Sequence, residues 1–182
     1  MPAYFKRLLA GYKRLLDRIG AFERALGIGL IFLIVAAITL QVFTRYALGR
    51  PIAWVEESAT YAFIWMVFVG ASAGLKQGRH ILIATFASHL PPRAAAALRA
   101  LVWILVLGTL VVLVVQGIKV MEVEGRSRTI SLPVELPRSW FYSLPLTVSA
   151  ASMVVTGVYL FLEELAILAG LSGRSTSPAA PA

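Results

Sequence analysis

An all-α integral membrane protein with four transmembrane helices is the fold class that this sequence predicts. Of its 182 residues, 59% are hydrophobic and only 14% are charged, and the mean hydropathy is +0.80. A soluble domain would carry about a quarter charged residues. Four apolar runs, at about 25–44, 54–75, 98–118 and 140–162, are each long enough to cross a hydrocarbon core roughly 30 Å thick. We expect one membrane domain, residues 1–171, followed by a disordered Ser-, Pro- and Ala-rich tail at 172–182.

Residues 2–24 predict a basic amphipathic helix that precedes the first span. Apolar residues such as Tyr4, Leu8 and Leu15 recur at helical spacing, and bases fill other positions. This pattern is typical of a helix that lies in the membrane interface against anionic lipid headgroups. A solvated helix packed on a partner is the alternative. The bases expected to contact headgroups are Lys6, Arg7, Lys13, Arg14 and Arg18.

Two adjacent carboxylates, Glu56 and Glu57, open the second run. They lie in the first helical turn, where the helix dipole favours negative charge. A capped, solvated helix end with Arg45 or Arg50 as partner is the simpler interpretation. An ion or proton site is the alternative.

The second half of the same run is rich in very small residues. Gly70 and Gly74 form a Gly-x-x-x-Gly pair with Ala71, Ser72 and Ala73 between them. Small residues let helix backbones approach closely in lipid. We therefore expect this face to pack against a neighbouring helix.

The segment 76–93 predicts a short amphipathic linker helix, too short to span the membrane. It holds His80 and His89, the only two histidines of the chain, and the chain has no cysteine. Haem in a membrane protein needs histidines that face each other within the spans, and thiolate metal sites need cysteine. We therefore predict no cofactor and no metal.

The loop 119–139 mixes charges of both signs, and Pro133 and Pro137 prevent a continuous helix there. Trp140 and Tyr142 open the fourth run and suit the headgroup level of a bilayer. Pro145 lies in its first turns, where it can kink the helix.

The bases also predict the topology. Eleven of the 17 lie on the side that holds both termini and the 76–93 linker, so we expect both termini in the cytoplasm. The bases lie mainly at the ends of apolar runs, which favours a topology signal over nucleic-acid binding. The eleven are Lys6, Arg7, Lys13, Arg14, Arg18, Arg24, Lys76, Arg79, Arg93, Arg99 and Arg174.

Several of these residues together resemble one family, the small membrane subunit of tripartite ATP-independent periplasmic (TRAP) transporters. The likeness covers roughly residues 20–165. It rests on Arg45-Tyr46, Pro51, Trp54, Glu56-Glu57, Trp65, Gly70-Ala71, Gly78-Arg79-His80-Ile81, Leu90-Pro91, Leu132-Pro133, Trp140, Tyr142 and Pro145.

The resemblance implies a three-part, sodium-coupled transporter in the bacterial inner membrane. A periplasmic binding protein captures an organic acid, and a large polytopic membrane subunit carries the substrate and sodium sites. The small subunit is a scaffold for the large one. The residues implied in the partner interface or in structure are Arg45, Trp54, Glu56, Glu57, Trp65, Gly70, Gly74, His80, Pro133, Trp140, Tyr142 and Pro145.

Two other classes of function remain as alternatives. An autonomous four-span transporter or channel, working as a homo-oligomer, would need a pore lined by residues such as Gln41, Glu56 or Glu57. No charge is expected near the membrane centre, which disfavours an ion pathway. A membrane enzyme or electron carrier would need a nucleophile–base pair or ligating histidines at membrane depth, and the sequence offers neither.

Overall fold

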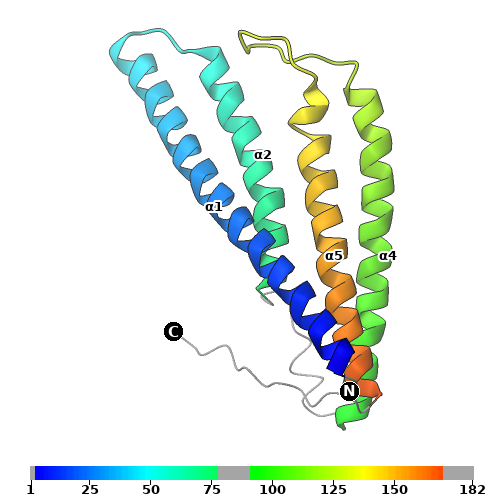
Figure 1. The fold of residues 1–182 in the computed structure, drawn as a ribbon. Coiled ribbons are helices and arrows are strands. Elements are labelled where there is room, and N and C mark those ends of the chain that lie inside the picture. Colours follow the sequence, from blue (N-terminus) through cyan, green and yellow to red (C-terminus); the bar gives the residue numbers. More distant parts are fainter. Residues whose placement is uncertain (1–2, 78–90, 170–182) are drawn as a thin grey trace.

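Four long α-helices run alternately up and down (Figure 1). The computed structural model describes residues 3–77 and 91–169. Each of the four helices is long and apolar enough to cross a membrane. The predicted all-α fold with four candidate spans is therefore confirmed. The elements are α1 (Ala3–Ala47), α2 (Ala53–Lys76), α4 (Pro92–Glu124), the 3-10 helix η1 (Arg138–Trp140) and α5 (Ser143–Leu168).

The structure corrects one expected boundary. The predicted interfacial helix at 2–24 and the first span at 25–44 are one uninterrupted helix, α1. The sequence has no proline between Ala3 and Ala47 that would interrupt the helix. At 1.5 Å per residue, α1 is roughly 67 Å long, about twice the hydrocarbon thickness. Placement of its first half in the membrane interface stays a prediction. The linker helix, His80 and the tail lie outside the described residues.

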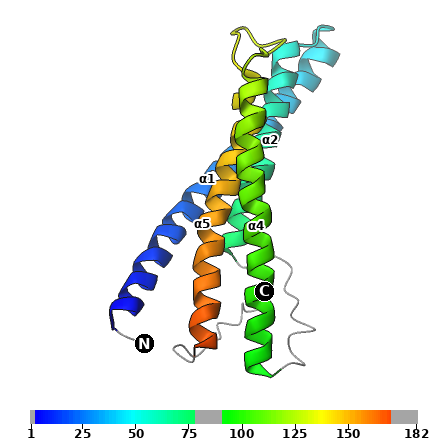
Figure 2. The same cartoon turned by 90° about the vertical axis from the view of Figure 1, so that its right-hand side faces the viewer.

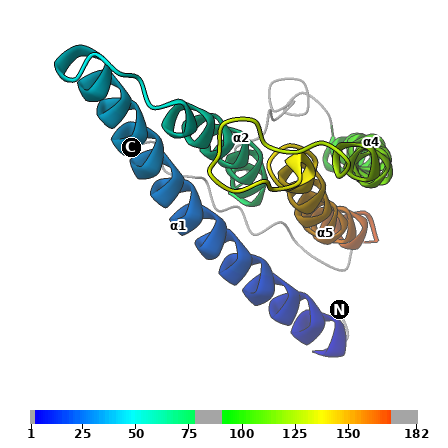
Figure 3. The ribbon, with the colours of Figure 1, turned by 90° about the horizontal axis from the view of Figure 1, so that it is seen from above.

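The helices form an open row in the order α1, α2, α5, α4. α1 packs along α2, α2 along α5, and α5 along α4, and the first half of α1 also contacts α5. Figure 2 shows that α1 is inclined to the other three helices, and Figure 3 shows α4 on the far side of α5 from α2. A row of helices has two open faces, so large apolar side chains such as Phe32, which is 72% exposed, remain uncovered. In a membrane, lipid or a partner protein must cover both faces.

The contacts between helices use many small and hydroxyl side chains beside larger apolar ones such as Val55 and Leu75. The most buried positions of α2 and α5 include Ser72, Ala150, Ser149 and Thr156. Lipid tails are as apolar as leucine, so close packing and hydrogen bonds, rather than the hydrophobic effect, hold membrane helices together. Thr156 donates to the carbonyl of Ser152 at 3.0 Å, which satisfies its hydroxyl within its own helix.

Glycine and proline shape the helix ends. Gly49 has a φ of +65°, a conformation that suits glycine, in the turn that joins α1 to α2. Pro92 is the first residue of α4, where a missing N–H breaks no helical hydrogen bond. Pro145 lies in the first turn of α5 because that helix begins at Ser143, after a break at 141–142. For the same reason Pro145 removes no helical hydrogen bond, and a kink need not follow.

α2 and α5 are staggered along their lengths. Tyr61, which is roughly 12 Å along α2, stacks on Phe141, just before α5 begins. The end of α2 consequently lies beside the middle of α5. We call the end of the molecule with residues 48–52 and 125–142 the loop end. The opposite end, where α1 begins and α5 finishes, is the terminal end (Figure 1).

Candidate functional site

Glu56 closes the turn between α1 and α2 at the loop end. The buried amide of Gln41 donates to Glu56 Oε2 at 3.4 Å, and Gln41 Oε1 accepts from the Ile52 N–H at 3.2 Å. Arg45 Nη2 lies 3.9 Å from Glu56 Oε2, with side chains 55% and 68% exposed. Such an exposed ion pair contributes little to stability. Arg45 is thus a partner of Glu56, as the sequence suggested. Gln41 holds the turn between α1 and α2 through its hydrogen bonds to Glu56 and to the Ile52 backbone.

Glu57 has a different role from its neighbour, because it holds the loop that precedes α5. Its two oxygens accept from the backbone N–H groups of Ile130, at 3.2 Å, and Ser131, at 2.6 Å. The Tyr61 hydroxyl donates to the same carboxylate. Hydrogen bonds to a charged group are among the stronger ones in proteins. Glu57 therefore ties residues 130–131 to α2 across 73 positions of sequence.

An aromatic cluster continues this contact between α2 and the start of α5. Tyr61 stacks on Phe141 with ring centroids 4.2 Å apart, and Tyr142 meets the Tyr61 ring edge-on at 5.7 Å. Trp65 Nε1 donates to the Trp140 carbonyl at 3.2 Å. The structure thus brings together three residues that the sequence singled out, Trp65, Trp140 and Tyr142. Of the remaining predicted residues, Pro145 is buried, whereas Trp54 and Pro133 are exposed.

A second polar cluster, which sequence reasoning missed, joins three helices. Lys76 of α2 forms an ion pair with Glu23 of α1 at 2.9 Å, and their side chains are only 6% and 10% exposed. The Lys76 ammonium also donates to Ser72 Oγ at 2.9 Å and to Ser152 Oγ of α5 at 2.7 Å. Both serine hydroxyls donate to Glu23 Oε1, at 2.9 and 2.8 Å. Every member of this Glu23–Lys76 network is therefore satisfied, and its net charge is zero.

The network joins different levels of its helices, so the expectation that no charge lies near the membrane centre stays a prediction. Along α2, Lys76 stands at the end of an apolar run, which is why the sequence placed it in the linker. Along the fourth run, however, Ser152 lies near the middle of the charge-free stretch 139–162, roughly 20 Å from one end and 15 Å from the other. Because α2 and α5 are staggered, Lys76 at the end of α2 meets Ser152 near the middle of the fourth run.

A second ion pair that the sequence did not single out connects α4 to α5. Arg99 Nε donates to Glu164 Oε1 at 2.7 Å, and the two side chains are mostly buried. Within the parts of the chain that the structure describes, no group of three or more His, Cys, Asp or Glu side chains could hold a metal ion.

The match to known proteins decides the family. Residues 34–166 match the family model of tripartite ATP-independent periplasmic transporters, DctQ component. The chain belongs to this family. It is 28% identical over 165 residues to the sialic acid TRAP transporter small permease protein SiaQ of Vibrio cholerae. This alignment covers 90% of this chain and 93% of that protein. It is 35% identical over 81 residues to the C4-dicarboxylate TRAP transporter small permease protein DctQ of the same organism, covering 42% of this chain and 35% of that protein.

DctQ membership confirms the resemblance that the sequence motifs suggested. It points to a transport protein rather than an enzyme, and it implies a large membrane subunit and a binding protein as partners. The matched range 34–166 includes Glu57, the aromatic cluster and Lys76, whereas Glu23 lies before it. The Glu23–Lys76 network therefore joins a residue within the DctQ match to one outside it.

Gly70 lies on an open face of this DctQ chain. A Cβ added at Gly70 would meet no atom within 4 Å among the described residues. Phe63 and Val67, seven and three positions earlier on the same stripe, are exposed as well. Gly74 is half-buried. The described helices therefore leave the Gly70 face uncovered, and the neighbour expected there must come from outside them.

Glu57→Ala should free the loop from α2. The variant loses two hydrogen bonds between backbone N–H groups and a carboxylate, each worth roughly 1.5–3 kcal/mol. We expect amide hydrogen exchange at Ile130 and Ser131 to accelerate at least about tenfold. Glu56→Ala is the matched control, because it removes the adjacent carboxylate without touching the loop. Equal exchange rates in both variants would contradict the anchoring role.

Proposed function

We propose that this chain is the membrane scaffold that braces the large transport subunit of a sodium-coupled, binding-protein-dependent TRAP transporter. The observation that carries the proposal is the open row of helices. Large apolar side chains remain uncovered on its faces, and Glu23 and Lys76, which lie between the helices, are paired with each other. A chain built in this way presents a broad surface to a partner.

The satisfied Glu23–Lys76 network favours a scaffold over an autonomous ion-coupled transporter. Ion and substrate sites in transporters use polar groups that remain available to the ligand, often on broken helices. Here the ammonium has Glu23, Ser72 and Ser152 as partners, and the carboxylate is neutralised. At the loop end, Gln41 is engaged by Glu56 and by the Ile52 backbone.

The transported substrate is proposed to be an organic acid with a carboxylate group. The two relatives from Vibrio cholerae are named for sialic acid and for C4-dicarboxylates, both of which are carboxylates. Specificity is assigned to the large subunit and the binding protein, the two partners that membership of the DctQ family implies.

The proposed location is the bacterial inner membrane, with both termini in the cytoplasm. In that orientation the loop end faces the periplasm, where the binding protein acts. Ile130 at this end is 83% exposed, and Glu57 holds the backbone beside it. We propose that this anchored apolar tip helps to dock the binding protein.

Affinity purification tests the scaffold role directly. A tag on the carboxyl-terminal tail, used in mild detergent on native membranes, should recover a large polytopic membrane protein in equal amount. Recovery of this chain alone, as a stable homo-oligomer, would contradict the scaffold role. That outcome would favour the autonomous transporter and make Gln41, Glu56 and Glu57 the first residues to mutate.

Gly70→Leu should reduce recovery of the large subunit several-fold, because a leucine there would separate two closely packed helices. The fold of the chain itself should tolerate the change, since the Gly70 position is open. Gly108→Leu is the matched control, because Gly108 of α4 also has nothing within 4 Å in the described structure. Gly74→Leu is less informative because Gly74 is half-buried in this chain. Full recovery with Gly70→Leu would remove the Gly70 face from the interface.

A further inference from the structure

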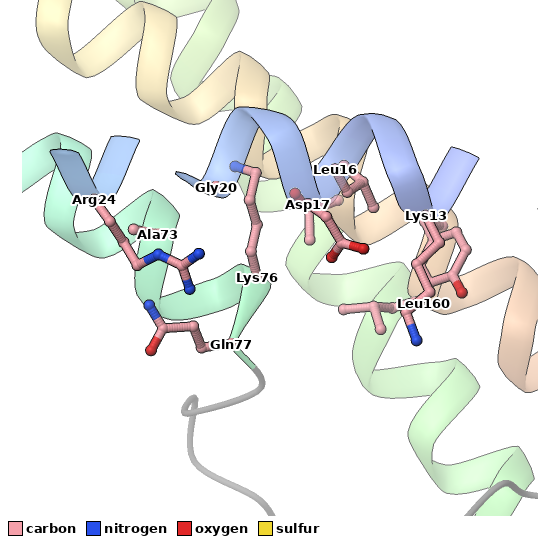
Figure 4. A pocket seen from close by; sticks show the side chains of 11 residues that line it. Lys13, Leu16, Asp17, Gly20, Arg24, Ala73, Lys76, Gln77 and Leu160 are labelled. Atoms are coloured by element: carbon pink, nitrogen blue, oxygen red, sulfur yellow. The ribbon is translucent and has the colours of Figure 1, made fainter. Parts of the chain in front are cut away.

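A pocket of about 240 Å³ lies between the first half of α1, the end of α2 and the middle of α5. Figure 4 shows Arg24 and Gln77 toward one side of it, Lys13 and Leu160 toward the other, and Asp17 between them. This pocket lies beside the Glu23–Lys76 network, and Lys76 lines it. Neither the family match nor the proposed scaffold role assigns a ligand to it.

The spacing of residues along α1 explains why one face of this helix lines the pocket. Lys13, Asp17, Gly20 and Arg24 follow one another at intervals of four, three and four, which places them on one stripe of a helix. Gly20 makes room, since a Cβ there would lie 3.2 Å from Lys76 Cδ. The Lys76 stem therefore lies close to α1, and its ammonium pairs with Glu23 of the same helix.

After Lys76 has paired with Glu23, the other charged side chains of the pocket have a net positive charge. Glu23 neutralises Lys76, so Lys13, Arg24 and Asp17 are left, which is two positive charges against one negative. These three side chains are exposed, and the buried Leu16 with Ala73 and Leu160 supplies an apolar wall. A basic opening beside an apolar wall between membrane helices suits a lipid headgroup and the start of its acyl chains.

We propose that this pocket binds an anionic phospholipid headgroup, with Arg24 as the ligand of its phosphate and Lys13 as a second positive charge on the other side of the pocket. The guanidinium of Arg24 can hold two phosphate oxygens at once, and Lys13 adds a second positive charge. The structure thereby divides the bases expected to contact headgroups. Lys13 lines the pocket, whereas the exposed Arg14 and Arg18 do not, and Arg24 joins the set.

Because Lys13 and Arg24 line the pocket and Arg14 and Arg18 do not, the two pairs of bases allow a matched test of lipid binding. The full chain in detergent is titrated with phosphatidylglycerol, and bound lipid is counted by native mass spectrometry. The double variant Lys13→Ala/Arg24→Ala should lose affinity by roughly tenfold or more. Arg14→Ala/Arg18→Ala removes the same charge from the same helix and should lose less than about threefold. Equal losses in the two double variants, or none in either, would overturn the proposal.

The variant Asp17→Asn is a control that distinguishes lost lipid binding from misfolding. It removes the one acidic side chain of the three, so affinity for phosphatidylglycerol should rise several-fold, which a damaged fold would not produce. Phosphatidylcholine, which has no net charge, should bind at least about tenfold more weakly than phosphatidylglycerol. Millimolar inorganic phosphate should leave the lipid bound. Displacement by phosphate would assign the pocket to free phosphate and overturn the lipid assignment, as would unchanged or weaker binding by Asp17→Asn.

Discussion

Glu23→Ala should lower the free energy of unfolding by roughly 3–5 kcal/mol, because it leaves the Lys76 ammonium buried without its counter-charge. The Lys76 and Glu23 side chains are only 6% and 10% exposed, so water cannot readily replace the missing carboxylate. Ser72 and Ser152 lose their acceptor at the same time. Unfolding by titration with sodium dodecyl sulfate from mild detergent measures the effect.

A double-mutant cycle separates the ion pair from the packing of its side chains. Glu23→Leu with Lys76→Met removes both charges and keeps apolar volume, so the double variant should be more stable than the sum of the single effects by about 2 kcal/mol. Arg45→Gln is the exposed-pair control and should change stability by less than about 1 kcal/mol. If Glu23→Ala is no worse than Arg45→Gln, the network does not hold the three helices together.

Gly117→Val should destabilise the chain by roughly 2–3 kcal/mol through overpacking between α4 and α5. A Cβ at Gly117 would press on Thr147 Oγ1 and lie 3.4 Å from Thr147 Cβ and 3.7 Å from its Cα. Thr147 cannot turn away freely, because it is buried and its hydroxyl donates to the Ser143 carbonyl at 2.7 Å. Relief would therefore require the two helices to move apart.

The same substitution at Gly108 is the control for Gly117→Val. Both glycines lie on α4, but an added Cβ at Gly108 meets nothing within 4 Å in the described structure. The two variants share the change in helix propensity, so the difference in their detergent unfolding measures the contact with Thr147. A difference below about 0.5 kcal/mol would mean that α4 and α5 do not pack as closely as the structure places them.

The sequence alone was sufficient for features that depend on local composition. Each apolar run has enough residues to cross a bilayer, and the structure has four helices long and apolar enough to do so among the described residues. The motifs around Glu56-Glu57, Trp65 and Trp140 were enough to indicate the DctQ family. These features could be predicted because a helix of sufficient hydrophobicity is specified by its own residues.

The tertiary structure alone decided which residues meet. Glu23 and Lys76 are 53 positions apart, and each looked like an ordinary base or acid at the edge of a span until the stagger of the helices paired them. The sequence also could not show which glycines lie in helix contacts. Gly70 has open space beside it and Gly117 packs against Thr147, although both stand in apolar helices. Hydropathy along a chain determines where helices form. The choice of neighbour, register and tilt depends instead on close packing and hydrogen bonds between distant segments, which no local pattern records.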